Sequence, residues 1–255
     1  DAQQNIHNPL GMSGHKLHGL FHTVWIESSV ANNLSSMLKR MGIHMDDIAY
    51  AGYLGSQICL RDHEKSLGAT HVDIGASATI LTTFHNNIMT DTCCIPLGGR
   101  HITHDLMCAF PQLSFSKVER VKILCGLGNT QNFDTSLVLP PKKIHTIIQA
   151  RLDEMRHKIH HALRKLRPSF FAQRQLVISG GSSQLLGLDH QWETHNLASA
   201  VRSASLPSIP NLDQAHRAEF SALNGWYYQI RASSKPSSLR LHTIVKKWLP
   251  WLKSS

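Results

Sequence analysis

One stretch of the sequence constrains the fold of this chain more than any other. Residues 68–99 read GATHVDIGASATILTTFHNNIMTDTCCIPLGG. Two groups of small and turn-forming residues, GASA and HNN, divide this stretch into three runs, 71–74, 79–84 and 88–97, which predict three β-strands in series. The tight turn between the first two strands exposes backbone N–H groups that can bind phosphate oxygens, and Asp73 at its mouth can hold a metal-bound water.

Helical periodicity on both sides of these strands predicts an α/β protein. Ser28 and Ser29 can cap the first helix, and Gly126 can close a later one. Residues 20–26 alternate as a strand does, residues 61–66 form a charged turn, and residues 175–188 form a strand, a Gly-Gly turn and a helix start whose amides suit an anion. Helices are expected at residues 30–41, 53–60, 103–109, 116–125 and 144–166, and the last of these is long and basic.

The charge balance favours an anionic partner. Lys and Arg number 26 against 17 Asp and Glu, so the chain carries a formal charge of +9 with neutral histidines. This charge suits acidic lipid, nucleic acid, nucleotide or an acidic peptide. Five cysteines without a paired spacing indicate a reducing compartment, and no apolar run approaches the roughly 20 residues that span a bilayer. Because residue 1 is aspartate, we expect the chain to begin inside a longer gene product.

The C-terminal segment, residues 239–255, has the pattern of an amphipathic membrane-surface helix. A polar, proline-containing linker at residues 231–238 precedes it. Two tryptophans on a basic helix favour an anionic membrane surface, whereas the alternative is a helix that docks on its own domain. Pro250 is expected to bend the helix or to end it near residue 249. The apolar half of the helical wheel holds Leu241, Ile244, Val245, Trp248, Leu249, Trp251 and Leu252, and the other half holds Lys246, Lys247 and Lys253.

Six segments in order give the chain a resemblance to a known family. NPLGMSG, GATHVDIGASATI, CIPLGGRHITHDL, KVERVKILCG, VISGGSSQLLGL and the terminal helix behind its linker resemble the bacterial cell-division protein FtsA of the actin-like ATPase superfamily. The resemblance extends over nearly the whole chain. It implies a partial actin-like, ribonuclease H-like fold, in which two lobes clasp ATP and each lobe has a mixed sheet flanked by helices, plus the C-terminal amphipathic helix.

The resemblance also implies an organisation along the chain. Residues 1–26 would end a small inserted subdomain, residues 27–66 would form first-lobe helices, and residues 67–205 would form the second lobe with its phosphate and adenosine motifs. Residues 206–230 would return to the first lobe, before the linker at 231–238 and the membrane-targeting tail at 239–255. The first phosphate loop and much of the first lobe would then be missing.

Individual residues receive roles from the same resemblance. The second phosphate loop would bind ATP and Mg²⁺ through Asp73, Gly75, Ala76, Ser77 and Thr79. Glu119 and Lys122 would face the ribose, and Gly180, Gly181 and Ser182 would border the adenosine. Arg151, on the long helix, would receive the acidic C-terminal peptide of the tubulin-like FtsZ, because an arginine can fork onto a carboxylate.

The phosphate turn departs from the family pattern of two or three glycines, a threonine and a later aspartate. Here the residues after Asp73 are IGASATI, so side chains crowd a turn meant for close phosphate approach. We therefore expect weak or lost ATP binding and no efficient ATPase. The interpretation is a peripheral protein of the inner face of the cell membrane, which tethers FtsZ filaments and can self-associate into actin-like filaments. The alternative is an ATP-hydrolysing enzyme of the actin and Hsp70 superfamily.

Several residues have competing interpretations. Ser116 and Glu119 match a capping box, which would fix Glu119 at the start of its own helix. Ser77 begins a pattern like a nucleophile elbow, but Thr79 stands where the last glycine is needed. The net charge alone would suit nucleic acid, yet no nucleic-acid motif accompanies it and no such partner is expected. No metal site is expected either, because two histidine groups lack a fourth ligand: His157, His160 and His161, and His101, His104 and Asp105.

Overall fold

The computed structural model describes most of the chain and resolves it into two compact units, residues 1–44 and residues 45–255. The described residues are 6, 11–16, 18–19, 21–126, 139–166, 175–185, 188, 192, 200–206 and 220–233. The predicted membrane-targeting tail, residues 239–255, lies outside this part of the chain, as does the linker before it apart from the end of the last helix. Each unit is described by itself.

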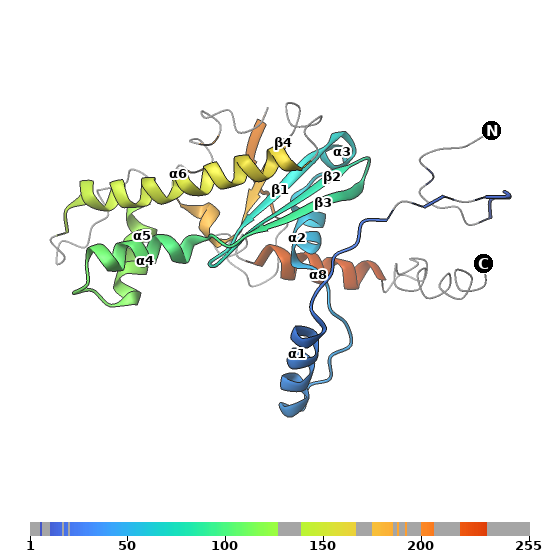
Figure 1. The fold of residues 1–255 in the computed structure, drawn as a ribbon, viewed down its shortest axis with the longest axis horizontal. Coiled ribbons are helices and arrows are strands. Elements are labelled where there is room, and N and C mark those ends of the chain that lie inside the picture. Colours follow the sequence, from blue (N-terminus) through green and yellow to red (C-terminus); the bar gives the residue numbers. More distant parts are fainter. Residues whose placement is uncertain are drawn as a thin grey trace. The chain divides into compact units, whose positions relative to one another are not determined.

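The larger unit is built on a mixed five-stranded sheet with the order β3-β2-β1-β4-β5 (Figure 1). Three strands in series form antiparallel pairs, as the sequence predicts, while β4 pairs in parallel with both β1 and β5. Asn86 and Asn87 form the turn between β2 and β3, and both have the positive φ that such a turn requires. The strands are β1 (Ala69–Ile74), β2 (Thr79–His85), β3 (Ile88–Ile95), β4 (Gln175–Ser179) and β5 (Ala200–Ser203).

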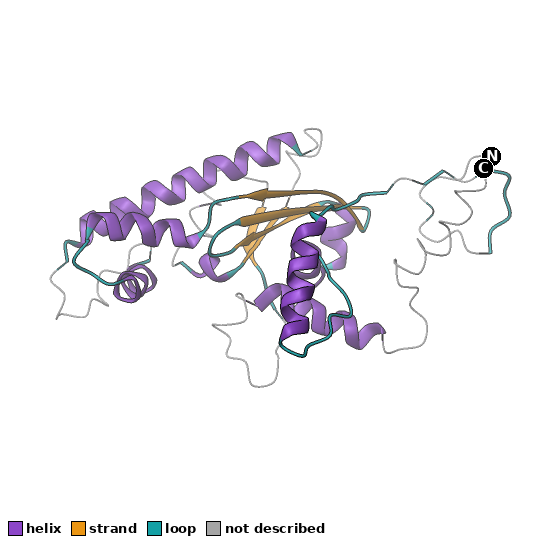
Figure 2. Cartoon of the chain, turned by 60° about the horizontal axis from the view of Figure 1, so that its bottom comes forward, coloured by secondary structure: helices purple, strands orange, loops and turns teal. Residues whose placement is uncertain are grey.

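Helices cover both faces of this sheet (Figure 2). The long helix α6 runs along one face, and α2 and α8 lie on the opposite side (Figure 1). The backbones of α2 and α8 are in contact, since a Cβ on Gly225 would lie 2.0 Å from the Leu54 carbonyl oxygen. The helices are α2 (Ala51–Cys59), α3 (Asp62–Leu67), α4 (Gly99–Ala109), α5 (Phe115–Cys125), α6 (Pro141–Lys165) and α8 (Ser221–Ser233), with the 3-10 helix η3 (Gly181–Gln184) after β4.

Alternating strand residues divide the core between the two faces. On β1, Val72 and Ile74 pack with the apolar side of α6, while Ala69 packs with Cys59 in a smaller cluster on the α2 side. The 25-residue α6 supplies seven buried side chains at helical spacing to the larger cluster: Ile144, Ile148, Leu152, Met155, Ile159, Ala162 and Leu163. This packing fixes the β1–β2 turn against α4, α5 and η3.

The smaller unit contains a single described helix, α1 (Ser28–Arg40), which matches the helix predicted at residues 30–41. The described residues before it, 21–26, are not a strand, so the strand predicted at 20–26 is wrong there. Alternation in an isolated segment has no partner strand to pair with. Neither Ser28 nor Ser29 caps α1, because Glu27 occupies the N-cap and Ser29 donates to the Glu27 carboxylate instead.

Two further expectations are corrected in the larger unit. Residues 61–66 are not a charged turn, because Asp62–Leu67 form the helix α3, whose Glu64 carboxylate accepts the backbone N–H of Arg61. Helix α4 begins at Gly99 rather than at Thr103. The sequence predicts neither strand nor helix at Gly98 and Gly99, but the carbonyls of Gly75 and Ala76 cap the first turn of α4 there.

Candidate functional site

The turn between β1 and β2, residues 75–78, is the centre of the candidate site. The Gly75 N–H donates to the Ala78 carbonyl over 3.0 Å and closes the turn. Ala76 and Ser77 at its tip are exposed. No residue of this turn has a positive φ. Alanine and serine therefore occupy this turn without the strain of a left-handed backbone.

Two other elements hold the back of this turn. The backbone N–H of Gly99 donates to the Gly75 carbonyl over 3.0 Å, and the N–H of Arg100 donates to the Ala76 carbonyl over 2.7 Å. The Ser182 hydroxyl, from η3, also donates to the Gly75 carbonyl over 3.1 Å. The first amides of α4 and one side chain of η3 thus occupy the Gly75 and Ala76 carbonyls of the turn.

Glycine is required at position 98, where a Cβ would meet backbone, and position 99 leaves little room for a side chain beside Ser182. A Cβ on Gly98 would lie 2.5 Å from the Gly75 carbonyl oxygen, and a Cβ on Gly99 would lie 2.1 Å from the Ser182 hydroxyl. Real Cβ atoms do not come so close to these groups, because the overlap is strongly repulsive. The glycine pair at the start of α4 is therefore what allows the turn, α4 and η3 to meet.

The outward amides of the site have no acceptor in the described part of the chain. The backbone N–H groups of Ala76, Ser77 and Ala78 make no hydrogen bond there, and neither do those of Gly181 and Ser182 at the start of η3. Successive backbone amides without an acceptor can bind anions such as phosphate oxygens. Unlike these outward amides, the hydroxyl of Thr79 faces inward, because it donates to the Leu97 carbonyl over 2.7 Å.

Asp73 lies beside the turn on the last part of β1. Gly180 passes it so closely, at φ +93°, that a Cβ there would lie 2.4 Å from one Asp73 carboxylate oxygen. The Ser221 hydroxyl of α8 donates to the other oxygen over 3.4 Å. Burial raises the pKa of the Asp73 carboxyl, and the bond from Ser221 only partly opposes this shift. A partly desolvated carboxylate next to free amides can hold a cation or its bound water.

A second polar cluster joins α4 to α5. The buried Lys122 ammonium donates to the Glu119 carboxylate over 2.6 Å, to the Thr103 hydroxyl over 3.1 Å and to the Gly99 carbonyl over 3.3 Å. The Thr103 hydroxyl donates to the other oxygen of Glu119. The capping-box interpretation of Ser116 and Glu119 is therefore wrong: Ser114 is the N-cap of α5, and Glu119 is bound to α4. The pair stands directly behind Gly99 and thus next to the turn.

The structure therefore brings most of the residues proposed for nucleotide binding into one place. The turn, η3 and the Glu119–Lys122 pair contact the first residues of α4, and Asp73 lies against Gly180 just before η3. Sequence reasoning missed Ser221, which reaches Asp73 across 148 positions of the chain and belongs to no motif. It also gave no role to Gly98 and Gly99, although they stand in the CIPLGGRHITHDL segment, because a glycine pair is a weak signal without knowledge of what approaches it.

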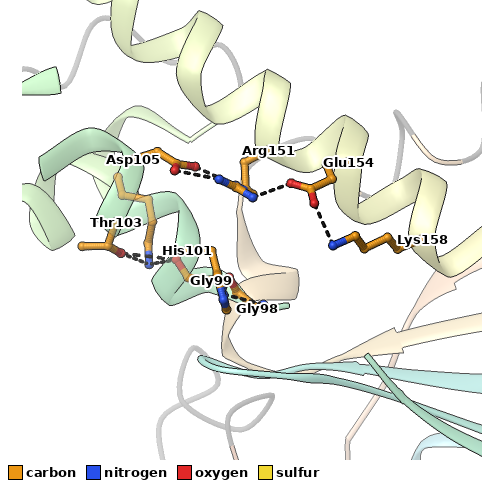
Figure 3. Close-up of polar contacts among 9 residues, drawn as sticks. Gly98, Gly99, His101, Thr103, Asp105, Arg151, Glu154 and Lys158 are labelled. Carbon is orange, nitrogen blue, oxygen red and sulfur yellow. Dashed lines mark hydrogen bonds and ion pairs between the residues drawn. The ribbon is translucent and has the colours of Figure 1, made fainter. Parts of the chain in front are cut away.

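Arg151 is already paired in the structure (Figure 3). Its guanidinium donates to both oxygens of Asp105 on α4, over 2.6 and 2.7 Å, and to Glu154 on α6. Lys158 contacts the other oxygen of Glu154 at 2.8 Å. The four side chains form one alternating row of charge, so a partner carboxylate must displace or share Asp105 to reach Arg151.

The described part of the chain contains neither a cluster of metal-ligating side chains nor a helix that could span a membrane. No three His, Cys, Asp or Glu side chains are grouped there so that they could hold a metal ion. No described helix is long and apolar enough to cross a membrane. The ten residues proposed for membrane binding, between positions 241 and 253, lie outside the described residues.

Comparison with known proteins gives a consistent result. The family model for "Cell division protein FtsA" matches residues 70–224. The FtsA of Pseudomonas aeruginosa is 27% identical over 200 residues, which are 73% of this chain and 48% of that protein. The FtsA of Helicobacter pylori is 28% identical over 223 residues, which are 80% of this chain and 44% of that protein.

Solved structures show the same architecture at lower identity. MreB 5 of Spiroplasma citri bound to AMPPNP superposes with a TM-score of 0.63 at 13% identity, covering 82% of this chain and 66% of that one. This likeness shows that the fold is actin-like, as the sequence predicts. The chain spans about half the length of the curated relatives that it matches. Because the family model matches well over half of its residues, the chain belongs to the FtsA family of cell-division proteins.

Proposed function

We propose that this protein acts in bacterial cell division as a membrane adaptor, which tethers FtsZ filaments to the inner face of the cell membrane. The observation that carries the proposal is the FtsA family match over residues 70–224, which runs from β1 into α8. The tail beyond α8 supports it, since residues 239–255 combine an apolar face holding two tryptophans with three lysines and no acidic residue. A helix of this composition binds at the headgroup level of an anionic membrane.

The attraction of this tail to the membrane is additive. Burial of the tryptophans and aliphatic side chains supplies an apolar term, and each lysine near an anionic surface adds about 1 kcal/mol. Binding to filaments, or assembly into filaments, would multiply such weak contacts through avidity. Modest affinity of one tail is therefore sufficient for an adaptor that works in an array.

Sedimentation with liposomes of increasing anionic-lipid content tests the anchor. The intact chain is expected to pellet in proportion to anionic lipid, and a chain truncated after Lys235 is expected to stay in solution. Replacement of Lys246, Lys247 and Lys253 by glutamine removes roughly 3 kcal/mol, which weakens binding by on the order of a hundredfold at low salt. Equal pelleting of intact and truncated chains would exclude the tail as the anchor.

Nucleotide binding is a second proposed property of the same protein. The free amides of residues 76–78 fit phosphate oxygens, Asp73 fits a hydrated cation, and Glu119 offers a carboxylate near the turn. Against tight binding, Glu119 already pairs with Lys122 and Thr103, and the turn carries side chains at Ala76 and Ser77. We therefore propose weak binding of ATP with Mg²⁺ and no efficient hydrolysis.

Titration with a fluorescent ATP analogue tests this second property. Wild-type protein is expected to bind the analogue weakly and only with Mg²⁺. The Asp73→Asn variant is expected to gain no binding from Mg²⁺, because the amide cannot replace the carboxylate charge. Magnesium-dependent turnover of ATP that disappears in Asp73→Asn would instead support the alternative, an ATP-hydrolysing enzyme of the superfamily.

A further inference from the structure

The first residues of helix α4 are held by the β1–β2 turn. The Gly99 N–H donates to the Gly75 carbonyl, and the Arg100 N–H donates to the Ala76 carbonyl. The peptide groups that contain these two carbonyls also contain the N–H groups of Ala76 and Ser77, which make no hydrogen bond within the described residues. Because the N–H and C=O of a trans peptide group point in opposite directions, α4 and an anion on the turn would occupy opposite ends of the same two peptide groups.

An anion on these two N–H groups strengthens the contact between the turn and α4. Hydrogen bonds in a chain polarise one another, so a peptide group that donates to an anion becomes a better acceptor at its carbonyl. The amides that α4 presents to these carbonyls belong to its first turn, where amides have no acceptor within the helix. Anion binding therefore stabilises the position that α4 has in this structure.

The same position of α4 places Asp105 on Arg151 of α6. Asp105 stands six residues after Gly99 on α4, which is about 9 Å along the helix axis. Its two carboxylate oxygens accept from Nε and Nη2 of Arg151 over 2.6 and 2.7 Å (Figure 3). The Arg151 side chain is 25% exposed and that of Asp105 is 30% exposed. This forked pair occupies the donors that the carboxylate of an acidic peptide would need.

We propose that α4 makes anion binding at the β1–β2 turn and acidic-peptide binding at Arg151 mutually antagonistic, with Asp105 as the internal competitor for the peptide carboxylate. An anion on the turn stabilises the α4 position in which Asp105 occupies Arg151. By linkage, a peptide that displaces Asp105 weakens anion binding by the same factor. This inference rests on the proposed function, because it needs both the anion site and the peptide site, and it adds the regulation of the second by the first.

Peptide affinity in two salts tests this antagonism. A fluorescently labelled C-terminal peptide of FtsZ is titrated with the 255-residue chain in potassium phosphate, or in potassium chloride of equal ionic strength so that charge screening is the same. The wild-type chain is expected to bind the peptide about threefold more weakly in phosphate. In chloride, Asp105→Asn is expected to bind about fivefold more tightly than the wild type, which is the value of a partly exposed ion pair. Its affinity should be the same in both salts.

Asp153→Asn is the matched control for the loss of one negative charge. Asp153 lies on α6 and pairs with Arg156. This variant is expected to bind the peptide within about twofold of the wild type and to keep the difference between the salts. Phosphate that bound directly to Arg151 would weaken the peptide more in Asp105→Asn than in the wild type, because the guanidinium is then free of its carboxylate. That result would overturn an antagonism that acts through α4.

Proton exchange at the Arg151 side chain tests the connection without any peptide. Nε–H of Arg151 donates to Asp105, so its exchange with water, measured by NMR, requires this pair to open. Phosphate is expected to slow the exchange at least about twofold relative to chloride. Nε–H of Arg202 is the internal control, because it donates to Glu64 on α3 and should exchange at the same rate in both salts.

The outcomes separate this inference from the proposed function. Peptide affinity that is equal in phosphate and chloride, or Asp105→Asn with the affinity of the wild type, would overturn the inference and leave the peptide site in place. Exchange at Arg151 that phosphate does not slow would also overturn it. A peptide that binds neither the wild type nor Asp105→Asn would remove the proposed peptide site and the inference with it.

Discussion

At the scale of single residues, His71 shows how the sheet is joined to α2. The Ser56 hydroxyl donates to the Gly52 carbonyl over 2.5 Å, so it accepts from Nδ1–H of His71 at 3.1 Å. The Ser179 hydroxyl then donates to Nε2 over 2.7 Å. Burial, with a smaller contribution from the positive charge of Arg202, lowers the pKa of His71 to about 3. This network connects α2, β1 and β4 directly beneath the candidate site.

The buried His71 should make stability depend on pH. Its pKa rises from about 3 in the folded chain to 6.5 in the unfolded chain, so only the unfolded chain gains a proton between these values. The free energy of unfolding should therefore fall, as pH falls from 6.5, by about 1.4 kcal/mol per pH unit from this residue. In urea denaturation at several pH values, the His71→Gln variant should have a lower free energy of unfolding than the wild type at pH 7. Its free energy of unfolding should then fall less steeply than that of the wild type as pH falls from 6.5.

The exposed His104 provides a control for this measurement. His104→Gln, which changes an exposed side chain outside the His71 network, is expected to follow the wild-type protein in the same measurement. An unchanged slope in His71→Gln would show that other groups cause the loss of stability in acid.

Gly180 should tolerate no side chain. It has a φ of +93°, and a Cβ would lie 2.4 Å from both an Asp73 carboxylate oxygen and the Ile74 carbonyl oxygen. We expect Gly180→Ala to lower the free energy of unfolding by more than about 2 kcal/mol, through strain and displacement of Asp73. Gly14→Ala is the control for chemical denaturation, since nothing lies within 4 Å of a Cβ there. Equal stability of the two variants would contradict the close approach of Gly180 to β1.

At the scale of elements, a buried ion pair fastens α3 to β5. Arg202 donates to both oxygens of Glu64, over 2.7 and 2.5 Å, and to the Cys59 carbonyl over 2.9 Å. The Glu64 side chain is fully buried. Although burial raises the pKa of Glu64, the hydrogen bonds from Arg202 and from the Arg61 N–H outweigh it and lower the pKa. The pair therefore stabilises the fold above the ordinary carboxyl pKa, and this contribution is lost as pH falls through the lowered value.

Removing one partner of this pair should be costly. Glu64→Gln leaves the Arg202 charge without its counter-ion in the interior, so we expect a loss of about 3 kcal/mol in the free energy of unfolding. Asp62→Asn, on the same helix, changes an exposed acid to an amide and should leave stability unchanged within error. The account of the α3–β5 contact would be wrong if the two variants unfolded at the same denaturant concentration.

The order of the elements could be predicted from the sequence, and several of their ends could not. Alternation and turn residues predicted β1, β2 and β3, because each strand is bounded by residues that cannot continue it. Helix α3 was missed because five of its six residues, DHEKS, are charged or polar and give no apolar period, and because its Glu64 is held by the distant Arg202. The start of α4 was missed because its cap comes from the carbonyls of residues 75 and 76.

The candidate site was predicted through motif order and not through contacts. The resemblance assigned Asp73, the turn, Glu119, Lys122 and the start of η3 to one nucleotide site. The structure brings these residues close together. The partners that hold them, Gly98, Gly99 and Ser221, lie on other elements and become visible only when the chain is folded. The capping box failed because Glu119 accepts from Thr103 on α4 and from Lys122 one turn further along α5, and not from the N-cap of its own helix.

At the scale of the whole molecule, the actin-like fold is followed in the sequence by the basic segment 239–255, for which we propose an amphipathic helix. This fold can present α4 and α6 to a partner, where Arg151 and Asp105 already form a forked ion pair. The tail carries the features of a membrane anchor in its sequence. An adaptor must bind both a protein partner and lipid with one chain. Its central property is therefore recruitment of the partner to lipid, and not the binding of either one alone.

Recruitment of FtsZ to anionic liposomes tests this central claim most directly. FtsZ filaments are sedimented with the liposomes in the presence of the intact chain, the chain truncated after Lys235, or the chain carrying Arg151→Glu. We expect FtsZ to pellet with lipid only when the intact chain is present. The truncated chain should bind FtsZ without lipid, and Arg151→Glu should bind lipid without FtsZ. An intact chain that brings no FtsZ to the liposomes, while it binds lipid itself, would contradict the adaptor function.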